Sequence, residues 1–228
     1  MKPSDMDDPA PTPPRISPST SPDDRTHPPT MPPPPQQPSQ ILLHLNPPRQ
    51  PASSPNIRLE VASDPKNLAS LKHLNSLLLP VNYRENFYKD ILTNPTDAAL
   101  SRVAFWDSGI SIVGGIRARW DAPETPPEDA AKRGGTIYLM TICVLSPFRR
   151  LGVALALLED LLQTAEAWGV DEVFAHVWQE NEDALEWYRK RGFTVDEGIV
   201  EGYYRKLRPD GARVVRLRIC TTTTTTVA

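Results

Sequence analysis

The chain has 228 residues, a formal net charge of −3 at pH 7 and two cysteines, Cys143 and Cys220. This charge excludes a globally basic nucleic-acid-binding protein, and two cysteines give neither a disulfide framework nor the ligand spacing of a metal site. No apolar run reaches the roughly 18 residues of a membrane-spanning helix, and the acidic N-terminus lacks the apolar stretch of a secretory signal. We therefore expect a soluble protein of a reducing compartment, the cytoplasm, with neither a membrane nor a specific nucleic acid as partner.

Aromatic residues and prolines divide the chain. All sixteen aromatic residues lie between Tyr83 and Tyr204, whereas eighteen of the twenty-six prolines lie within the first 55 residues. A Pro-rich segment without aromatic side chains cannot bury enough apolar surface to offset its ordering entropy. We predict a disordered Pro-rich tail over 1–56, one folded domain over 57–219 and a low-complexity, Thr-rich end over 220–228. A ligand for a proline-binding module in the tail is the alternative to a plain solvated segment.

The first half of the domain alternates between strand and helix patterns. Residues 57–61 predict a strand, and Asp64-Pro65 begins a helix that Pro80 ends. A second helix is expected over 86–92. Residues 100–105 and 110–120 flank a turn and predict a hairpin. The apolar run over 136–145 is typical of a central strand that is buried on both faces.

The second half repeats the alternation. We expect a helix over 153–168 and a strand over 172–177, then a helix from Asn181 that ends at Arg191-Gly192. Strands are expected over 193–200 and 203–207, with a basic edge strand over 213–219 for which an RNA or ribosome contact is the alternative reading. The order predicts an α/β (α+β) domain whose mixed central sheet has about seven strands and is flanked by four helices.

The segment Arg149-Arg150-Leu151-Gly152-Val153-Ala154 lies between the buried strand and the long helix. A helix N-terminus offers unpaired N–H groups and the positive end of the helix dipole. A glycine there permits close backbone approach, and two arginines add charge-assisted hydrogen bonds. The pattern favours a phosphate-binding turn, with an ordinary strand–turn–helix and a solvated arginine pair as the alternative.

This turn and the later segment Tyr188-Arg-Lys-Arg-Gly192-Phe193 together resemble the GNAT family of acetyl-CoA-dependent N-acetyltransferases. Further segments follow in the order of a NatE-type catalytic subunit, an N-terminal acetyltransferase: Leu79-Pro-Val-Asn-Tyr83, Phe87-Tyr-Lys-Asp90, Tyr138-Leu-Met-Thr141 and Tyr203-Tyr204. The resemblance covers about 57–208. It implies a GNAT fold, acetyl-CoA as co-substrate and no metal.

The resemblance also implies roles for individual residues. Tyr138 and His176 would relay the proton of the amine through a water, and Tyr188 would lie beside the thioester sulfur. The implied acetyl-CoA-binding residues are Ile142, Val144, Arg149, Arg150, Leu151, Gly152, Val153, Ala154, Asn181 and Tyr188. The implied walls and clamps for the peptide are Leu79, Pro80, Val81, Tyr83, Met140, Tyr203 and Tyr204. Leu79 stands where the family usually has Phe, which alters the pocket for the first residue.

The chemistry fits these residue types. An α-amine has a reference pKa near 7.7–8.0, so only modest help frees its lone pair, and histidine suits proton transfer near neutral pH. Taken without the resemblance, His176 reads as a core histidine and Tyr138 as sheet packing.

The leading function is N-terminal acetylation of a nascent Met followed by an apolar residue, in the cytoplasm with a nuclear pool as an option. The resemblance implies protein N-termini as partners, with the NatA complex and the ribosome as further ones. The alternatives are a GNAT enzyme acting on lysine or small amines and a non-catalytic scaffold subunit of the NatA complex.

Overall fold

The computed structural model describes residues 56–107 and 109–219. Apart from Asn56, the predicted tail over 1–56 lies outside the described residues, as does the Thr-rich end over 220–228. Within the described ranges, no helix is both long enough and apolar enough to span a membrane.

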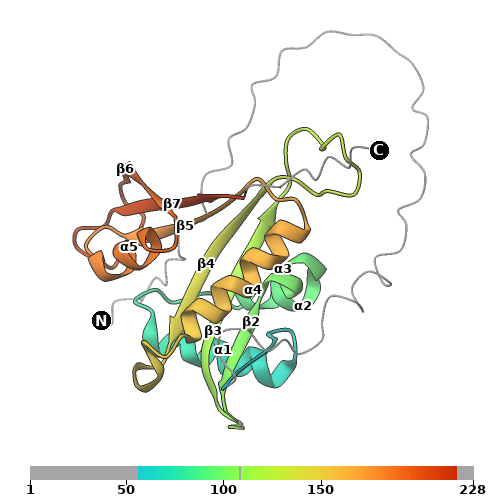
Figure 1. Ribbon diagram of the computed structural model, residues 1–228. Coiled ribbons are helices and arrows are strands. Elements are labelled where there is room, and N and C mark those ends of the chain that lie inside the picture. Colours follow the sequence, from blue (N-terminus) through green and yellow to red (C-terminus); the bar gives the residue numbers. More distant parts are fainter. Residues whose placement is uncertain (1–55, 108, 220–228) are drawn as a thin grey trace, which may run out of the picture.

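A single mixed sheet of seven strands organises the described part of the chain, in the order β1-β2-β3-β4-β5-β7-β6 (Figure 1). Only β4 and β5 run parallel, and every other neighbouring pair is antiparallel. The strands are β1 (Ile57–Val61), β2 (Arg102–Trp106), β3 (Ile112–Asp121), β4 (Thr136–Val144), β5 (Glu172–Trp178), β6 (Thr194–Val200) and β7 (Ala212–Arg218). The predicted mixed sheet of about seven strands is confirmed.

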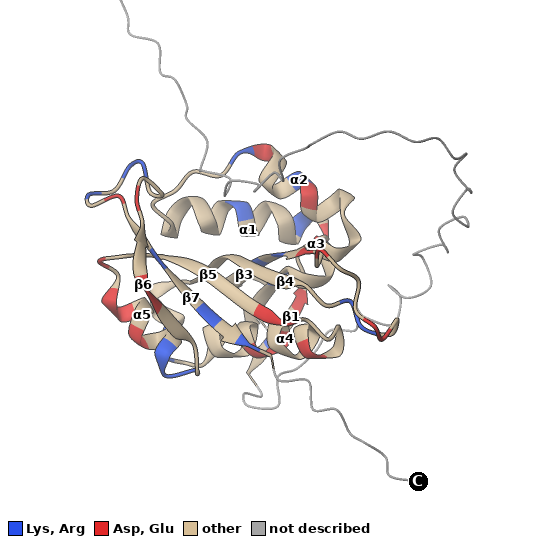
Figure 2. Ribbon diagram, turned by 90° about the horizontal axis from the view of Figure 1, so that it is seen from above, with Lys and Arg blue, Asp and Glu red and all other residues tan. Residues whose placement is uncertain are grey.

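Helices cover both faces of this sheet. Helices α1 and α2 lie on one face, and α4 and α5 lie on the other (Figure 2). The helices are α1 (Pro65–Leu78), α2 (Glu85–Thr93), α3 (Pro95–Leu100), α4 (Val153–Ala167) and α5 (Glu182–Arg189). Four of them match the expected helices, and the short α3 is additional.

Helix α3 was not predicted because Asn94-Pro95 both ends α2 and begins α3. The sequence reading took this dipeptide only as the end of α2. In the structure the Asn94 side chain also accepts a hydrogen bond from Thr96 N at 2.9 Å, so it caps a new helix with Pro95 in the first turn. The strand expected from residue 100 therefore begins at Arg102.

Two predictions at the C-terminal end were wrong. Residues 203–207 form no strand but belong to the connection between β6 and β7. The basic strand over 213–219 is β7, which lies inside the sheet between β5 and β6, so the edge strand is β6. Arg216 of β7 is accommodated inside the sheet because it pairs with Glu172 on β5 at 2.7 Å and with Asp196 on β6 at 2.9 Å.

The main hydrophobic core lies between the sheet and α4. Its centre includes Ile116, Ile137, Leu157 and Leu161, all at most 2 % exposed. A smaller cluster around Leu71 and Ile91 packs α1 and α2 against β2 on the opposite face. Burial of apolar surface on both faces fixes the central strands between the two helix layers.

A buried ion pair fastens α4 to β2. The Arg102 Nε lies 3.1 Å from the Asp160 Oδ2, and both side chains are at most 7 % exposed. Arg102 also donates to the carbonyls of Ala98 and Ser101, each at 3.2 Å.

We expect Asp160→Ala to lower the free energy of unfolding by about 3–5 kcal/mol, because it leaves the Arg102 charge buried without its carboxylate. Urea titration measures this loss. Arg189→Ala is the control: it removes a solvent-exposed ion pair with Glu182 and should barely move the midpoint. Equal effects of the two variants would contradict this account of the buried pair.

Candidate active site

The parallel strands β4 and β5 separate halfway along their length. Their ladder runs from Thr136↔Glu172 only as far as Leu139↔Ala175. Beyond that point β4 stays paired with β3, whereas β5 stays paired with β7. Among the described residues, one edge of β4 therefore has no strand partner after Leu139, so its backbone N–H and C=O groups can bind an extended ligand that carries amides.

A bulge in β4 coincides with this separation. Arg117 on β3 pairs with Thr141 and the next residue, Ala118, pairs with Leu139, so Met140 has no partner on β3. The extra residue changes which side chains share a face. Tyr138 and Thr141 now lie on the α1 face of the sheet, whereas Leu139 and Ile142 lie toward α4.

A cavity of about 1260 Å³ lies where the strands part, between β4, the turn before α4, and α5. Its lining contains nine of the ten predicted acetyl-CoA-binding residues: Ile142, Val144, Arg149, Arg150, Gly152, Val153, Ala154, Asn181 and Tyr188. The tenth, Leu151, is 45 % exposed and does not line it. The cavity is large enough for a drug-sized or larger ligand.

The turn before α4 has the backbone geometry of an anion site. Gly152 has φ of 88° and Arg150 φ of 63°, so both lie in the left-handed region. Gly152 caps α4 without a side-chain hydrogen bond, and the N–H groups of the first helical turn have no intrahelical acceptor. The Arg149 Nε donates to the Val144 carbonyl at 3.2 Å, which ties this arginine to the end of β4. These groups fit a pyrophosphate.

Tyr188 forms part of the far wall of the cavity. It is 5 % exposed on α5 and packs edge-on against Phe193, with ring centroids 5.0 Å apart. Asn181 fixes the start of that helix by accepting from Ala184 N at 3.2 Å. Burial raises the pKa of Tyr188, so its hydroxyl stays protonated at neutral pH and can donate a hydrogen bond to a ligand in the cavity.

Tyr138, His176 and Tyr203 form one cluster on the opposite face of the sheet. The Tyr138 and Tyr203 hydroxyls are hydrogen-bonded to each other. The Tyr203 ring stacks on His176 with centroids 4.4 Å apart and planes at 9°, and Tyr138 meets the same imidazole edge-on at 5.4 Å. The predicted proton-relay pair is thus brought together, and Tyr203, predicted only as a peptide wall, contacts both members.

The His176 ring is held neutral. Burial, with a smaller contribution from the Arg216 charge, lowers the pKa of His176 to about 4. Its Nδ1 is buried without a hydrogen-bond partner among the described residues. A neutral imidazole with an unused nitrogen can accept a proton or a hydrogen bond from a bound amine or water.

The predicted peptide walls separate into two groups. Tyr204 lies with the cluster, because its hydroxyl donates to the His176 carbonyl at 3.1 Å and its ring contacts that of Tyr203. Tyr83 stacks on Phe87, and burial raises its pKa. Leu79 instead lines the cavity. Pro80 is exposed, Val81 is half-buried, and Met140 is the half-buried residue of the β4 bulge.

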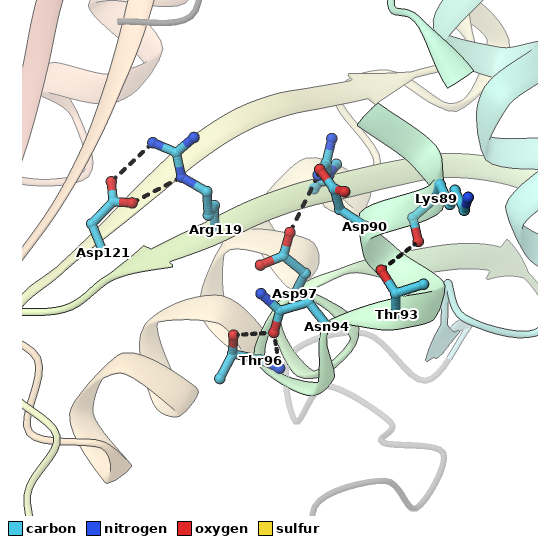
Figure 3. Close-up of polar contacts among 9 residues, drawn as sticks. Lys89, Asp90, Thr93, Asn94, Thr96, Asp97, Arg119 and Asp121 are labelled. Atoms are coloured by element: carbon cyan, nitrogen blue, oxygen red, sulfur yellow. Dashed lines mark hydrogen bonds and ion pairs between the residues drawn. The ribbon is translucent and has the colours of Figure 1, made fainter. Parts of the chain in front are cut away.

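Sequence reasoning missed two supporting residues of the cluster. Phe174 stacks on Tyr138 with centroids 4.9 Å apart. Phe174 lies two residues before His176 on the same strand. Side chains at this spacing share one face of a sheet, so the sequence could have predicted that Phe174 lies beside His176. Arg119 lies over Tyr138 at 5.7 Å and is held by two hydrogen bonds to Asp121, at 2.8 and 3.1 Å (Figure 3). No sequence signal links Arg119 to Tyr138 before the register of β3 and β4 is known.

A second missed group joins α1 and α2 to β4. The Cys143 thiol donates to Asn75 Oδ1 at 3.3 Å, and Asn75 Nδ2 donates to the Tyr88 hydroxyl at 3.4 Å. Burial raises the pKa of Cys143 to about 12, so the thiol is a packing group here and no nucleophile. No cluster of potential metal ligands occurs within 56–107 and 109–219.

Comparison with known proteins identifies the family. The model of the acetyltransferase (GNAT) family matches residues 68–193. The probable N-acetyltransferase san of Drosophila melanogaster is 33% identical over 153 residues, which cover 67% of this chain and 76% of that protein. N-alpha-acetyltransferase 50 of Danio rerio is also 33% identical over 153 residues, covering 67% of this chain and 83% of its own.

Solved structures agree. Arabidopsis thaliana Naa50 in complex with the bisubstrate analogue CoA-Ac-MVNAL has a TM-score of 0.60 and 29% identity, and covers 71% of this chain and 98% of its own. Arabidopsis thaliana NAA60 in complex with acetyl-CoA shares the fold, with a TM-score of 0.61 at 18% identity, over 72% of this chain and 98% of its own.

The chain therefore belongs to the GNAT family of acetyltransferases. Within it the chain is similar over two-thirds of its length to N-alpha-acetyltransferase 50, and it is an acetyl-CoA-dependent N-alpha-acetyltransferase. The cavity between β4 and α5 fits acetyl-CoA as co-substrate, because it combines a free strand edge for amides with a helix N-terminus and two arginines for phosphates.

We expect Gly152→Asp to weaken acetyl-CoA binding by about 100-fold, because the added carboxylate would repel the pyrophosphate at the N-terminus of α4. Calorimetry without peptide measures the Kd. Gly202→Asp is the matched control: it also has a positive φ, of 70°, and no atom within 4 Å of the added Cβ, but it lies in the β6–β7 connection. Equal losses in both variants would contradict the assignment of the turn.

Proposed function

We propose that this acetyltransferase acetylates protein N-termini that begin with Met followed by an apolar residue. The observation that carries the proposal is the meeting of two half-sites at the parting of β4 and β5. One half is the cavity with its anion-binding turn, and the other is the Tyr138–Tyr203–His176 cluster on the opposite face of the sheet. An acetyl donor in the first can meet an amine in the second only through the gap between the strands.

Acetyl-CoA supplies an acetyl thioester, which is already activated toward amines. The residues of the chain have to select a neutral amine and remove one proton from it. At neutral pH a fair share of α-amines is unprotonated, since their pKa lies near 7.7–8.0. His176 offers its unpaired Nδ1 as acceptor while the amine bonds to the acetyl carbon, and the hydroxyls of Tyr138 and Tyr203 can carry the proton onward.

The departing sulfur needs a proton, and the developing oxygen charge needs donors. The proton that the amine loses balances the one that the sulfur gains, and Tyr188, which lines the cavity with a protonated hydroxyl, can donate a hydrogen bond to the sulfur as its negative charge develops. The unpaired edge of β4 beyond Leu139 offers backbone N–H groups for the second. Both groups are fixed by packing, so they require no rearrangement during the reaction.

The acceptor pocket favours a chain terminus. In this proposal, Tyr83 on the α1–α2 connection lies across the acceptor pocket from Tyr203 and Tyr204 on the β6–β7 connection, whose rings contact each other with centroids 4.8 Å apart. Such a clamp suits an extended peptide end better than a lysine presented from the middle of a chain. The Naa50 structure named above was solved with a peptide portion that begins Met-Val, which supports the same preference.

The proton-handling roles predict the behaviour of single and double variants. Tyr138→Phe and His176→Ala should each lower kcat by about 10²- to 10⁴-fold. Neither residue lines the cavity, so the Kd of acetyl-CoA should not change. Because both act in one cluster, the double variant should lose little more than the worse single variant.

Tyr88→Phe serves as the control for these variants. It removes a buried hydroxyl that is bonded to Asn75 and belongs to a different group, so turnover should be close to normal. Additive losses of kcat at Tyr138 and His176, or full turnover in either single variant, would contradict the proton-transfer roles and leave both residues with a structural role alone.

A peptide panel tests the acceptor. We expect kcat/KM for a Met-Leu peptide to exceed that for Met-Asp by about 100-fold, because a charged second residue would be buried unpaired in an apolar wall. A change of one methylene should alter it only about 10-fold. Ser-Glu and internal-lysine peptides should react poorly. A panel in which any of these three matches Met-Leu would end the proposal.

The natural acceptors under this proposal are the N-termini of nascent chains in the cytoplasm. Association with the NatA complex and with ribosomes belongs to the same proposal and rests on the resemblance alone.

A further inference from the structure

Arg117 is a fully buried charge beneath the peptide side of the site. It lies on β3 and is 1 % exposed. Its Nη2 lies 3.2 Å from Asp97 Oδ2 on α3 and 3.6 Å from Asp90 Oδ2 on α2. The two aspartates lie beside each other between these helices and the sheet (Figure 3). One guanidinium thus joins three elements: β3, α2 and α3.

An aromatic stack leads from this charge to the peptide wall. The Arg117 guanidinium lies 3.7 Å from the centroid of the Phe87 ring. Phe87 in turn stacks on Tyr83, with centroids 4.1 Å apart and planes at 26°. The order outward from the sheet is therefore Arg117, Phe87, Tyr83. Tyr83 is close enough to Tyr203 of the proton-handling cluster for the two hydroxyls to interact electrostatically.

The cost of this arrangement argues against simple filling of the core. Arg117 Nε and Nη1 and Asp97 Oδ1 are all buried without a hydrogen-bond partner among the described residues. Burial lowers the pKa of Arg117 and raises that of Asp97, so each ion is held against a desolvation penalty. An apolar side chain would fill the same space without that penalty, but it would not attract the face of an aromatic ring.

We infer that Arg117 is a positioning residue that holds Tyr83 against the incoming peptide terminus, through its contact with the Phe87 ring. This inference rests on the proposed function, because it takes Tyr83 as part of the acceptor pocket. Arg117 touches neither substrate itself. It sets the affinity for the peptide and leaves acetyl-CoA binding alone, since it does not line the cavity.

The first test uses the full-length chain with Arg117→Met, which keeps an apolar stem and removes the guanidinium. We expect the KM for a Met-Leu peptide to rise about tenfold, with a smaller change in kcat and an unchanged Kd for acetyl-CoA. Phe87→Leu removes the ring that joins Arg117 to Tyr83 and leaves the buried charges in place. This variant provides the test if Arg117→Met does not fold. In the double variant, KM should rise no further than in the worse single variant.

Arg102→Met is the matched control. Arg102 is also a buried arginine paired with a buried aspartate, but its partner Asp160 lies on α4, on the opposite face of the sheet from the helix that carries Phe87 (Figure 2). It should cost stability while leaving the peptide KM unchanged. A normal KM in Arg117→Met or Phe87→Leu, or an equal rise in Arg102→Met, would overturn the inference.

Amide hydrogen exchange separates this inference from the proposed function. Exchange over 79–88 should become faster in Arg117→Met and Phe87→Leu but not in Arg102→Met. If the wild-type chain acetylates no N-terminal peptide, the proposed function fails, and exchange still decides whether Arg117 holds Tyr83. Unchanged exchange in both variants would overturn the positioning role regardless of activity.

Discussion

The separation of β4 from β5 beyond Leu139 and Ala175 is the constraint on which the rest of the structure depends. A sheet normally satisfies every backbone group of its inner strands, so an unpaired edge in its centre is costly unless a ligand takes over. Here each strand retains its outer neighbour, β3 or β7, and the sheet divides into two leaves (Figure 1). The cavity occupies the space between the leaves, and the bulge at Met140 lies where they part.

The two sides of the gap differ in how they treat charge. The cavity side presents Arg149, Arg150 and a helix N-terminus without a side-chain cap, all of which favour an anion. The peptide side keeps its groups neutral, because burial raises the pKa of Tyr138 and lowers that of His176. Under the proposed function, a polyanionic donor and an uncharged amine would thus bind on opposite faces of the same strand. This division follows from burial and helix geometry and needs no metal ligand.

Much of this site could be predicted from local sequence. The anion-binding turn was predictable because a glycine between a strand and a helix has a direct meaning in backbone geometry, and Gly152 indeed has φ of 88°. Tyr138 and His176 were predictable as neighbours because they lie on successive parallel strands. The contacts of Tyr203 were not, since its loop was mistaken for a strand, and neither was Arg117, whose partners Asp97 and Phe87 lie 20 and 30 residues away. Interactions between distant elements depend on register, which periodicity alone does not determine.

The place of β7 in the sheet has a consequence for how the enzyme comes into being. Among the strands of the described residues, β7 comes last in sequence, yet it inserts between β5 and β6 and is the only one of them that pairs with β5 beyond Ala175. During synthesis, β5 and α5 are made well before the segment that holds them in place. Strands that lie about 40 residues apart also pair slowly, because the chain loses the entropy of closing the loop before the contacts between the strands can form. The first leaf can thus assemble while the chain is still growing, but the wall that carries Tyr188 becomes firm only after residues 212–218 have been added. An acetyltransferase built in this order cannot complete its active site until residues 212–218 have been synthesised.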